Sequence, residues 1–193
     1  MYEKLRLFFE RSIPLTEEQF EFIKTLFIPK IFKKGEFLLR EGDVAKYSIF
    51  VASGCLRTYI IDNKGKEHIL QFSPENWWTG DMNSLISGGP SQCFIEAIED
   101  SEILFVEPNS LQKASEIIPA MATNFQVALQ KSAAAKNQRI ASSLSATAEE
   151  RYSNFLKTYP SLAQRVPQHM IASYLGVSPE TLSRIRKKKS HKQ

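Results

Sequence analysis

The spacing of hydrophobic positions changes twice along this chain of 193 residues. Residues 1–27 alternate charged and apolar positions at helical spacing, and Thr16-Glu17-Glu18-Gln19 has the pattern of a capping box that starts a helix. From Ile28 to Val106, short apolar runs alternate with turn residues about every 8–12 positions, a pattern typical of an all-β sandwich or barrel. Beyond Pro108 the spacing of three and four returns, which predicts helices.

The predicted barrel contains three runs rich in β-branched and aromatic side chains, at residues 48–51, 56–61 and 68–72. A glycine-bearing turn, Asp62-Asn63-Lys64-Gly65, separates the second run from the third. We interpret this region as a jelly-roll-like barrel. Trp77 and Trp78 lie within it, and they either pack in the core or lid of the barrel or fill a pocket.

A long helix is predicted at about residues 119–143, because apolar and small residues recur there in steps of three and four. Its stretch Ser132-Ala133-Ala134-Ala135 would let another helix approach closely, so we hypothesise a two-fold dimer along this helix. The alternative is that the apolar stripe packs on the barrel of the same chain.

The last thirty residues have the spacing of a helix-turn-helix, from Pro167 to Arg186. Ala172 is the small residue at the contact of two helices, and Gly176 suits the turn because glycine adopts positive φ without a Cβ clash. Ser178-Pro179 supplies an N-cap and a first-turn proline for the second helix. The inner face of that helix is predicted to carry Leu182 and Ile185.

Charge is concentrated in the same part of the chain. Residues 150–193 hold nine Lys or Arg and two Asp or Glu, a balance of +7, whereas residues 1–149 have a balance of −3. This distribution is typical of a surface that binds phosphates. The alternative is a small helical bundle followed by a solvated basic tail. The placement of the charges favours DNA as the partner.

Composition argues against several other classes of protein. No apolar run approaches the ~20 residues of a membrane span, and Met1–Arg6 lacks a signal-peptide pattern, so we expect a cytoplasmic protein. Cys55 and Cys93 are too few for a disulfide framework and are expected to be buried thiols. Because His68 is the only histidine of the barrel region, a cupin-like metalloenzyme is disfavoured. We predict no catalytic residues, no metal and no cofactor, and therefore no enzyme.

A barrel followed by a long helix and a helix-turn-helix resembles the Crp-Fnr family of bacterial transcription regulators. Residues 32–36 and 41–43 are similar to the opening hairpin of the family's cyclic nucleotide-binding barrel, and residues 62–72 are similar to its central hairpin. Gly80-Asp81-Met82 resembles the start of its phosphate-binding cassette.

The resemblance implies an α+β fold in which a jelly-roll barrel, or double-stranded β-helix, is followed by a long dimerisation helix and a helical helix-turn-helix domain without an evident wing. We accordingly expect three regions. These are a cyclic nucleotide-binding-like sensor barrel with N-terminal helices at 1–118, the dimerisation helix at 119–145 and the DNA-binding domain at 146–193.

Two departures from the family pattern change the expected contacts. Members that bind cyclic AMP carry an Arg-Ser or Arg-Thr pair where this chain has Ser91-Gln92-Cys93. Loss of such a desolvated charge partner costs roughly 2–5 kcal/mol, so we expect weak or no binding of cyclic AMP or cyclic GMP. Most members also continue into a β-hairpin wing, whereas residues 187–193 are too few and too charged for paired strands. The lysines there are expected to take over the phosphate contacts of the wing.

Together these features predict a DNA-binding transcription regulator that binds two-fold-symmetric sites as a homodimer without a cyclic AMP-type ligand. The predicted partners are double-stranded DNA and a second copy of the chain, with RNA polymerase as a further candidate, while the sequence does not identify an effector. The alternative is a cyclic nucleotide- or other small-molecule-binding sensor module that acts through a protein partner.

Arg184 is expected to read a base, because a guanidinium can bond O6 and N7 of guanine together. Glu180 has the acceptor that cytosine N4 requires. Pro179 replaces an arginine of the family pattern, so the target sequence is expected to differ from that of cyclic AMP-responsive members. The predicted DNA-binding residues are Gln168, His169, Ser178, Pro179, Glu180, Ser183, Arg184, Lys187, Lys188 and Lys189. The predicted effector pocket comprises Gly80, Asp81, Met82, Ser91, Gln92 and Cys93.

Overall fold

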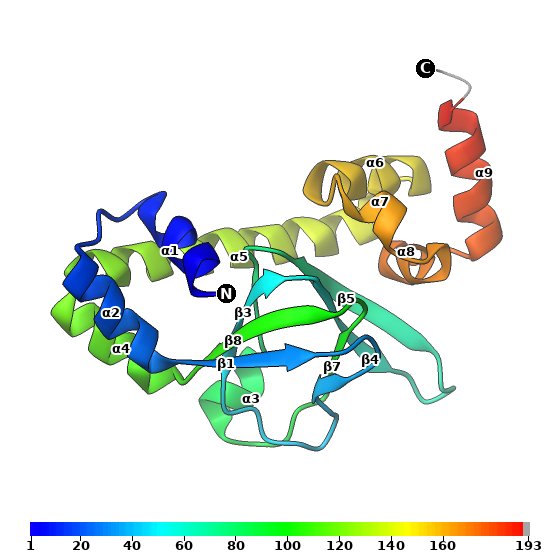
Figure 1. Ribbon diagram of the computed structural model, residues 1–193. Helices are drawn as coiled ribbons and strands as arrows, with labels where there is room; N and C mark the ends of the chain where they lie inside the picture. Colours follow the sequence, from blue (N-terminus) through cyan, green and yellow to red (C-terminus); the bar gives the residue numbers. More distant parts are fainter. Residues whose placement is uncertain (191–193) are drawn as a thin grey trace. The chain divides into compact units, whose positions relative to one another are not determined.

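The computed structural model describes residues 1–190 and divides into two compact units (Figure 1). The first unit comprises Met1–Ile60 and Gln71–Leu129, and the second comprises Ile61–Leu70 and the chain from Gln130 onward. Within residues 1–190, no helix combines the length and the apolar character that crossing a membrane requires.

The elements follow the order that the hydrophobic pattern predicts, with short helices first, strands in the middle and helices at the end (Figure 1). They are α1 (Tyr2–Glu10), α2 (Glu17–Leu26), β1 (Phe27–Phe32), β2 (Phe37–Leu39), β3 (Ser48–Ser53), β4 (Cys55–Ile61), β5 (Glu67–Pro74), β6 (Trp78–Thr79), α3 (Met82–Ser87), β7 (Phe94–Ala97), β8 (Ser101–Val106), α4 (Pro108–Ile117), α5 (Pro119–Ser145), α6 (Ala148–Thr158), α7 (Leu162–Arg165), α8 (Gln168–Leu175) and α9 (Pro179–Ser190).

The strands form a jelly roll of two four-stranded sheets, ordered β1-β8-β3-β6 and β2-β7-β4-β5. Strands distant in sequence pair in antiparallel fashion, as in β1 with β8 and β2 with β7. Apolar side chains from both sheets fill the interior and are almost completely buried, including Ile49, Leu56, Ile95 and Ile103. The predicted α+β fold with an N-terminal jelly roll is confirmed.

The other face of the first sheet is covered by helices of the same unit. Phe50 and Leu104 on this face share a buried cluster with Leu5 and Phe9 of α1. Trp78 packs in the same cluster, with its ring 5.3 Å from the ring of Phe50. The interpretation that Trp78 fills a pocket is therefore wrong, because its side chain packs under the helices.

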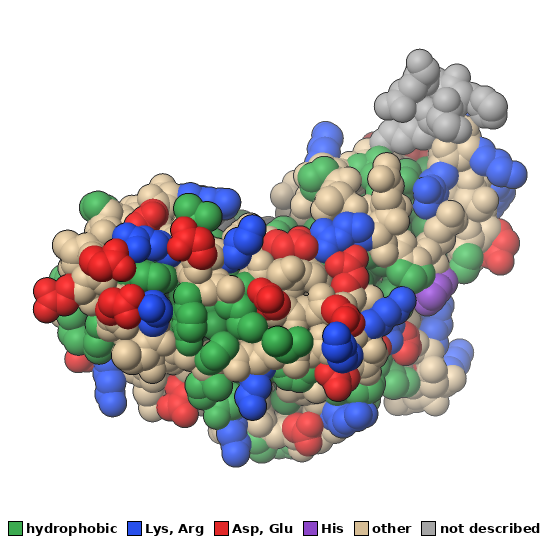
Figure 2. Space-filling view, viewed as in Figure 1, with side chains coloured by type: hydrophobic (Ala, Val, Ile, Leu, Met, Phe, Trp, Pro, Cys, Tyr) green, Lys and Arg blue, Asp and Glu red, His purple; other side chains and the backbone are tan. Residues whose placement is uncertain are grey.

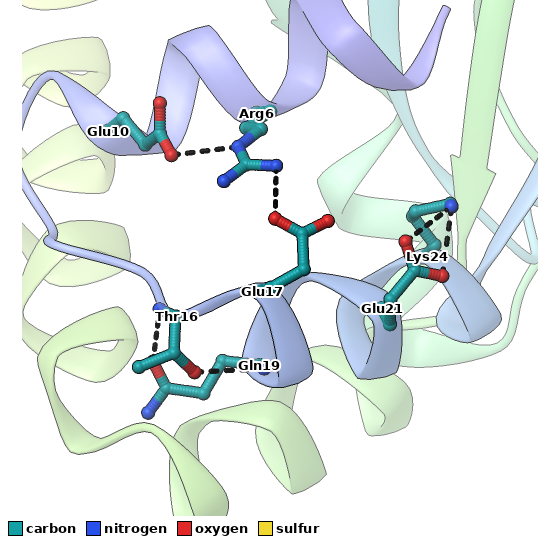
Figure 3. Close-up of polar contacts among 7 residues, drawn as sticks. All are labelled: Arg6, Glu10, Thr16, Glu17, Gln19, Glu21 and Lys24. Carbon is teal, nitrogen blue, oxygen red and sulfur yellow. Dashed lines mark hydrogen bonds and ion pairs between the residues drawn. The ribbon is translucent and has the colours of Figure 1, made fainter.

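Polar contacts fix the two N-terminal helices against each other (Figure 3). Arg6 of α1 donates from Nε to Glu10 Oε1 at 2.8 Å and from Nη1 to Glu17 Oε2 of α2 at 2.7 Å. The predicted capping box is present, since Gln19 N donates to Thr16 Oγ1 at 3.2 Å and Thr16 N donates to Gln19 Oε1 at 3.1 Å. The start of α2 is thus set by local sequence.

The second unit has an aromatic core of its own. Phe155 of α6 lies with its ring 5.5 Å from that of Tyr159 and 5.6 Å from that of Tyr174 on α8. Leu162 of α7 and Ile171 of α8 are completely buried. These contacts hold α8 and give the helix-turn-helix a rigid base.

Candidate nucleic-acid interface and effector pocket

The turn between α8 and α9 has the predicted geometry. Gly176 adopts φ 66° and ψ 36°, the left-handed conformation that glycine tolerates best, and caps α8. Val177 N donates to Ala172 O at 3.0 Å across the turn. The chain therefore leaves α8 sharply and can begin a second helix almost at once.

The start of α9 is also as predicted. Ser178 Oγ accepts a hydrogen bond from Thr181 N at 3.2 Å, and Pro179 is the first residue of the helix. Leu182 and Ile185 are buried on the inner side, and Ala172 of α8 is buried as well. The predicted inner face is confirmed, and it determines which side of α9 is left open to a partner.

The outer face of α9 carries the predicted DNA-binding side chains. Figure 2 shows Lys and Arg side chains gathered over α9. Ser183 is half-buried, and the side chain of Lys189 lies outside the described part of the structure, as do residues 191–193. The exposed members of the predicted set are Gln168, His169, Ser178, Pro179, Glu180, Arg184, Lys187 and Lys188.

Glu180 lies next to the N-cap in the first turn of α9. A hydrogen bond with Ser178, together with one from its own backbone N–H, lowers the pKa of Glu180 below its usual value. The carboxylate is therefore ionised at neutral pH, and both its oxygens are acceptors. This is the protonation state that a contact with cytosine N4 requires.

A cleft of about 490 Å³ lies beside this face, between the start of α6 and the side of α9. Arg184 Nη2 donates to Thr181 Oγ1 at 3.2 Å, and Lys188 Nζ donates to Glu149 Oε1 at 2.7 Å. Thr147, Glu149 and Thr181 are not among the residues predicted from the sequence, although Thr147 and Glu150 form a capping box that the sequence displays. The lining residues are Thr147, Ala148, Glu149, Thr181, Arg184, Ile185 and Lys188.

In the first unit, the cassette residue Asp81 bonds to the cassette itself. Its Oδ1 accepts from Asn83 N at 3.0 Å and from Ser84 N at 3.3 Å, so that Asp81 caps α3. Its Oδ2 accepts from Ser91 Oγ at 2.8 Å and from Cys93 Sγ at 3.8 Å. Ser91 stands where cyclic AMP-binding relatives carry arginine, and here its hydroxyl joins the two ends of the cassette instead of supplying a cation.

A pocket of about 530 Å³ opens next to this cassette. Of the six predicted pocket residues, Gly80 and Asp81 line it, whereas Met82, Ser91, Gln92 and Cys93 are not among the lining residues. Among the lining residues, Lys46 carries the positively charged side chain. Most of the pocket wall is apolar. This wall was not predicted from the sequence, because it includes apolar residues from four different strands. The full lining is Leu38, Leu39, Asp43, Val44, Ala45, Lys46, Tyr47, Ile49, Gly80, Asp81, Ile95 and Phe105.

Cys93 is expected to react slowly with thiol reagents. Its side chain is 8% exposed, and burial raises the pKa of the thiol, so the reactive thiolate is scarce at neutral pH. Mass spectrometry after timed exposure of the native protein to iodoacetamide at pH 7.5 measures this rate, with the guanidinium-unfolded protein as the control. Modification of Cys93 in the native protein as fast as in the unfolded protein would contradict the expectation.

Among residues 1–190, no group of three or more His, Cys, Asp or Glu side chains is arranged to hold a metal ion. Residues 29–116 match the cyclic nucleotide-binding domain family. A putative Crp/Fnr-family regulator from Eubacterium rectale has a similar structure, with a TM-score of 0.65 and 19% identity over 92% of this chain and 85% of that one. The chain thus shares its fold with this regulator, as the resemblance to the Crp-Fnr family implies.

Two further proteins are similar to this chain. FixK2 from Bradyrhizobium japonicum has a TM-score of 0.71 and 24% identity, covering 86% of this chain and 85% of that one. The transcriptional activator protein Anr of Pseudomonas aeruginosa is 27% identical over 167 residues, which are 79% of this chain and 66% of that protein. The matched region thus spans 66% of the length of this curated relative.

Proposed function

We propose that this chain is a DNA-binding transcription regulator that binds two-fold-symmetric sites as a homodimer, without a cyclic AMP-type ligand. The observation that carries the proposal is the outer face of α9, where Arg184, Glu180 and Lys187 are exposed while Leu182 and Ile185 are buried. A helix held in this way presents its side chains to base edges in the major groove. The names of relatives such as Anr agree with this role.

In this proposal the phosphate contacts surround the reading helix. Gln168 and His169 are exposed at the start of α8, and the hydroxyls of Thr147 and Thr181 border the cleft beside Arg184. Lysines of α9 add positive charge. Such contacts release counterions from DNA, so binding is expected to weaken steeply as salt rises.

The dimer is supported by the exposed apolar side chains of α5. Met121 is buried and Phe125 packs in the first unit, so the first part of the apolar stripe packs on its own chain. Farther along, Ile140 is 61% exposed and Leu144 is 84% exposed, four residues apart on one face of the helix. An exposed apolar face of this kind suits a second copy of the helix. Ala133 and Ala134 are also exposed, whereas the side chains of Ser132 and Ala135 lie outside the described part.

The three-region division, with the sensor barrel at 1–118, the dimerisation helix at 119–145 and the DNA-binding domain at 146–193, belongs to this proposal. In it the chain acts in the cytoplasm as a regulator rather than as an enzyme. Double-stranded DNA is its main partner, and RNA polymerase is a further one.

Cyclic AMP and cyclic GMP are expected not to bind at micromolar concentration. Both oxygens of Asp81 already accept hydrogen bonds from the cassette, and Ser91 occupies the place of the phosphate-binding arginine. A buried cyclic phosphate would therefore face a carboxylate without a cation from the cassette. Isothermal titration calorimetry of the full chain tests this expectation, and a micromolar dissociation constant for either nucleotide would overturn it.

The experiment that tests the proposed function is an in vitro selection of the purified chain on a random duplex library, with and without cyclic AMP, at moderate salt. Enrichment of a two-fold repeat without the nucleotide is the expected result. Enrichment only with cyclic AMP would refute the ligand-independent part of the proposal. If neither arm enriches a sequence and a protein partner binds with no dependence on salt, the DNA-binding role is wrong.

A further inference from the structure

The tip of the β4–β5 hairpin, residues 61–70, has a closed turn of its own. Asp62 Oδ1 accepts from Lys64 N at 2.9 Å and from Lys66 N at 3.0 Å, while Asp62 Oδ2 lies 2.7 Å from His68 Nε2. The contact with His68, followed by the two backbone bonds, lowers the pKa of Asp62 to about 2. The carboxylate therefore keeps the turn closed over the pH range in which proteins work.

Strand β5 is the last strand of its sheet, so within residues 1–190 one of its sides has no strand partner. The backbone groups on such an edge need hydrogen-bond partners from elsewhere. Ser173 of α8 supplies both a donor and an acceptor there. Its Oγ accepts from Ile69 N at 3.1 Å and donates to Glu67 O at 2.9 Å. One hydroxyl thus bonds to the tip as a neighbouring strand would.

Arg139 of α5 binds the same tip from a second helix. Its Nη2 donates to Ile69 O at 2.7 Å and to Tyr174 O of α8 at 3.0 Å, and its Nη1 donates to Leu70 O. The guanidinium carbon lies 4.1 Å from the centre of the Tyr174 ring, which is cation–π distance. Arg139 therefore connects the tip, the first helix of the helix-turn-helix and the long helix.

We propose that Ser173 and Arg139 are positioning residues that latch the hairpin tip onto α8 and so hold the first helix of the helix-turn-helix in place for DNA binding. Residues 61–70 belong to the same compact unit as α8 and α9, although the remainder of β4 and β5 belongs to the barrel unit. The contacts of the latch therefore lie within a single unit. The effect on DNA rests on the proposed function, whereas the latch itself does not.

Amide hydrogen exchange at Ile69 tests the latch without DNA. Ser173→Ala removes the acceptor of the Ile69 N–H, so exchange at this amide is expected to become at least tenfold faster. Ser143→Ala is the matched control, because Ser143 Oγ donates to Ile140 O within its own helix. Arg139→Gln is the second variant, and circular dichroism checks that each variant is folded. Unchanged exchange at Ile69 in folded Ser173→Ala would overturn the latch.

The positioning role is tested on the duplex that the selection yields. Ser173→Ala and Arg139→Gln are expected to lower affinity at least threefold, and Ser143→Ala is expected to leave it unchanged. Coupling between two sites is reciprocal, so saturating duplex should slow exchange at Ile69 in the natural chain by a similar factor. Faster exchange at Ile69 with unchanged affinity would overturn the positioning role. If no duplex is selected while Ser173→Ala still speeds exchange, the proposed function fails and the latch stands.

Discussion

Arg184→Ala is expected to weaken binding to the selected duplex by about 1–3 kcal/mol and to relax the preference at one position in each half-site. The reason is that Arg184 is exposed on the outer face of α9, where its two-pronged guanidinium can bond both acceptors of a guanine edge. Fluorescence anisotropy measures the effect against duplexes that carry each of the four bases at that position.

Lys187→Ala is the matched control, because lysine is expected to contact phosphate and carries no sequence information. Its loss should weaken binding to all duplexes alike and should reduce the slope of log affinity against log salt by about 1. If Arg184→Ala also weakened all duplexes equally, Arg184 would be a phosphate contact and the base-reading role would be wrong.

The second large effect is expected from the double variant Ile140→Glu with Leu144→Glu. These side chains are 61% and 84% exposed, and carboxylates there would put repelling charges into the proposed contact between two α5 helices. Sedimentation analysis at micromolar concentration should show a monomer. A monomer binds one half-site at a time and lacks the high effective concentration that a dimer has at the second half-site. Affinity for the two-fold site should therefore fall about 100-fold or more.

Gln138→Glu provides the control for added charge, since Gln138 is exposed on another side of the same helix. This variant should remain a dimer and keep its affinity for DNA. A natural chain that is already monomeric at micromolar concentration would contradict the dimer along α5, and so would a double variant that remains dimeric.

Much of the fold follows from local rules that a sequence displays directly. The capping box at Thr16 and Gln19, the turn glycine Gly176 and the N-cap Ser178 each act within a few residues, and each has the predicted geometry. Helix α3 was missed because it has only six residues and lies within a run of turn signals. It forms because the side chain of Asp81 accepts from its first backbone N–H groups.

The candidate sites also contain some features that local sequence patterns predict and others that they do not. The outer face of α9 follows from helical periodicity once Leu182 and Ile185 are placed inside. The pocket wall, the cleft beside Arg184 and the contacts of Ser173 with the hairpin tip could not be predicted, because they join residues far apart in the sequence. Ser173 and Ile69, for example, are separated by 104 positions, and no local pattern reports such a pair.

The ion pair between Lys188 and Glu149 has a consequence for how DNA affinity depends on salt. In the free protein this ammonium already has a carboxylate neighbour at 2.7 Å, so a contact with phosphate exchanges one anionic partner for another. Salt screens the internal pair as well as the contact with DNA. Lys188 should therefore contribute less than one full charge to the salt dependence of DNA binding. The carboxylate of Glu149 also weakens the attraction of Lys188 to DNA phosphates, whatever the base sequence. The same ion pair thus favours discrimination over tight nonspecific binding.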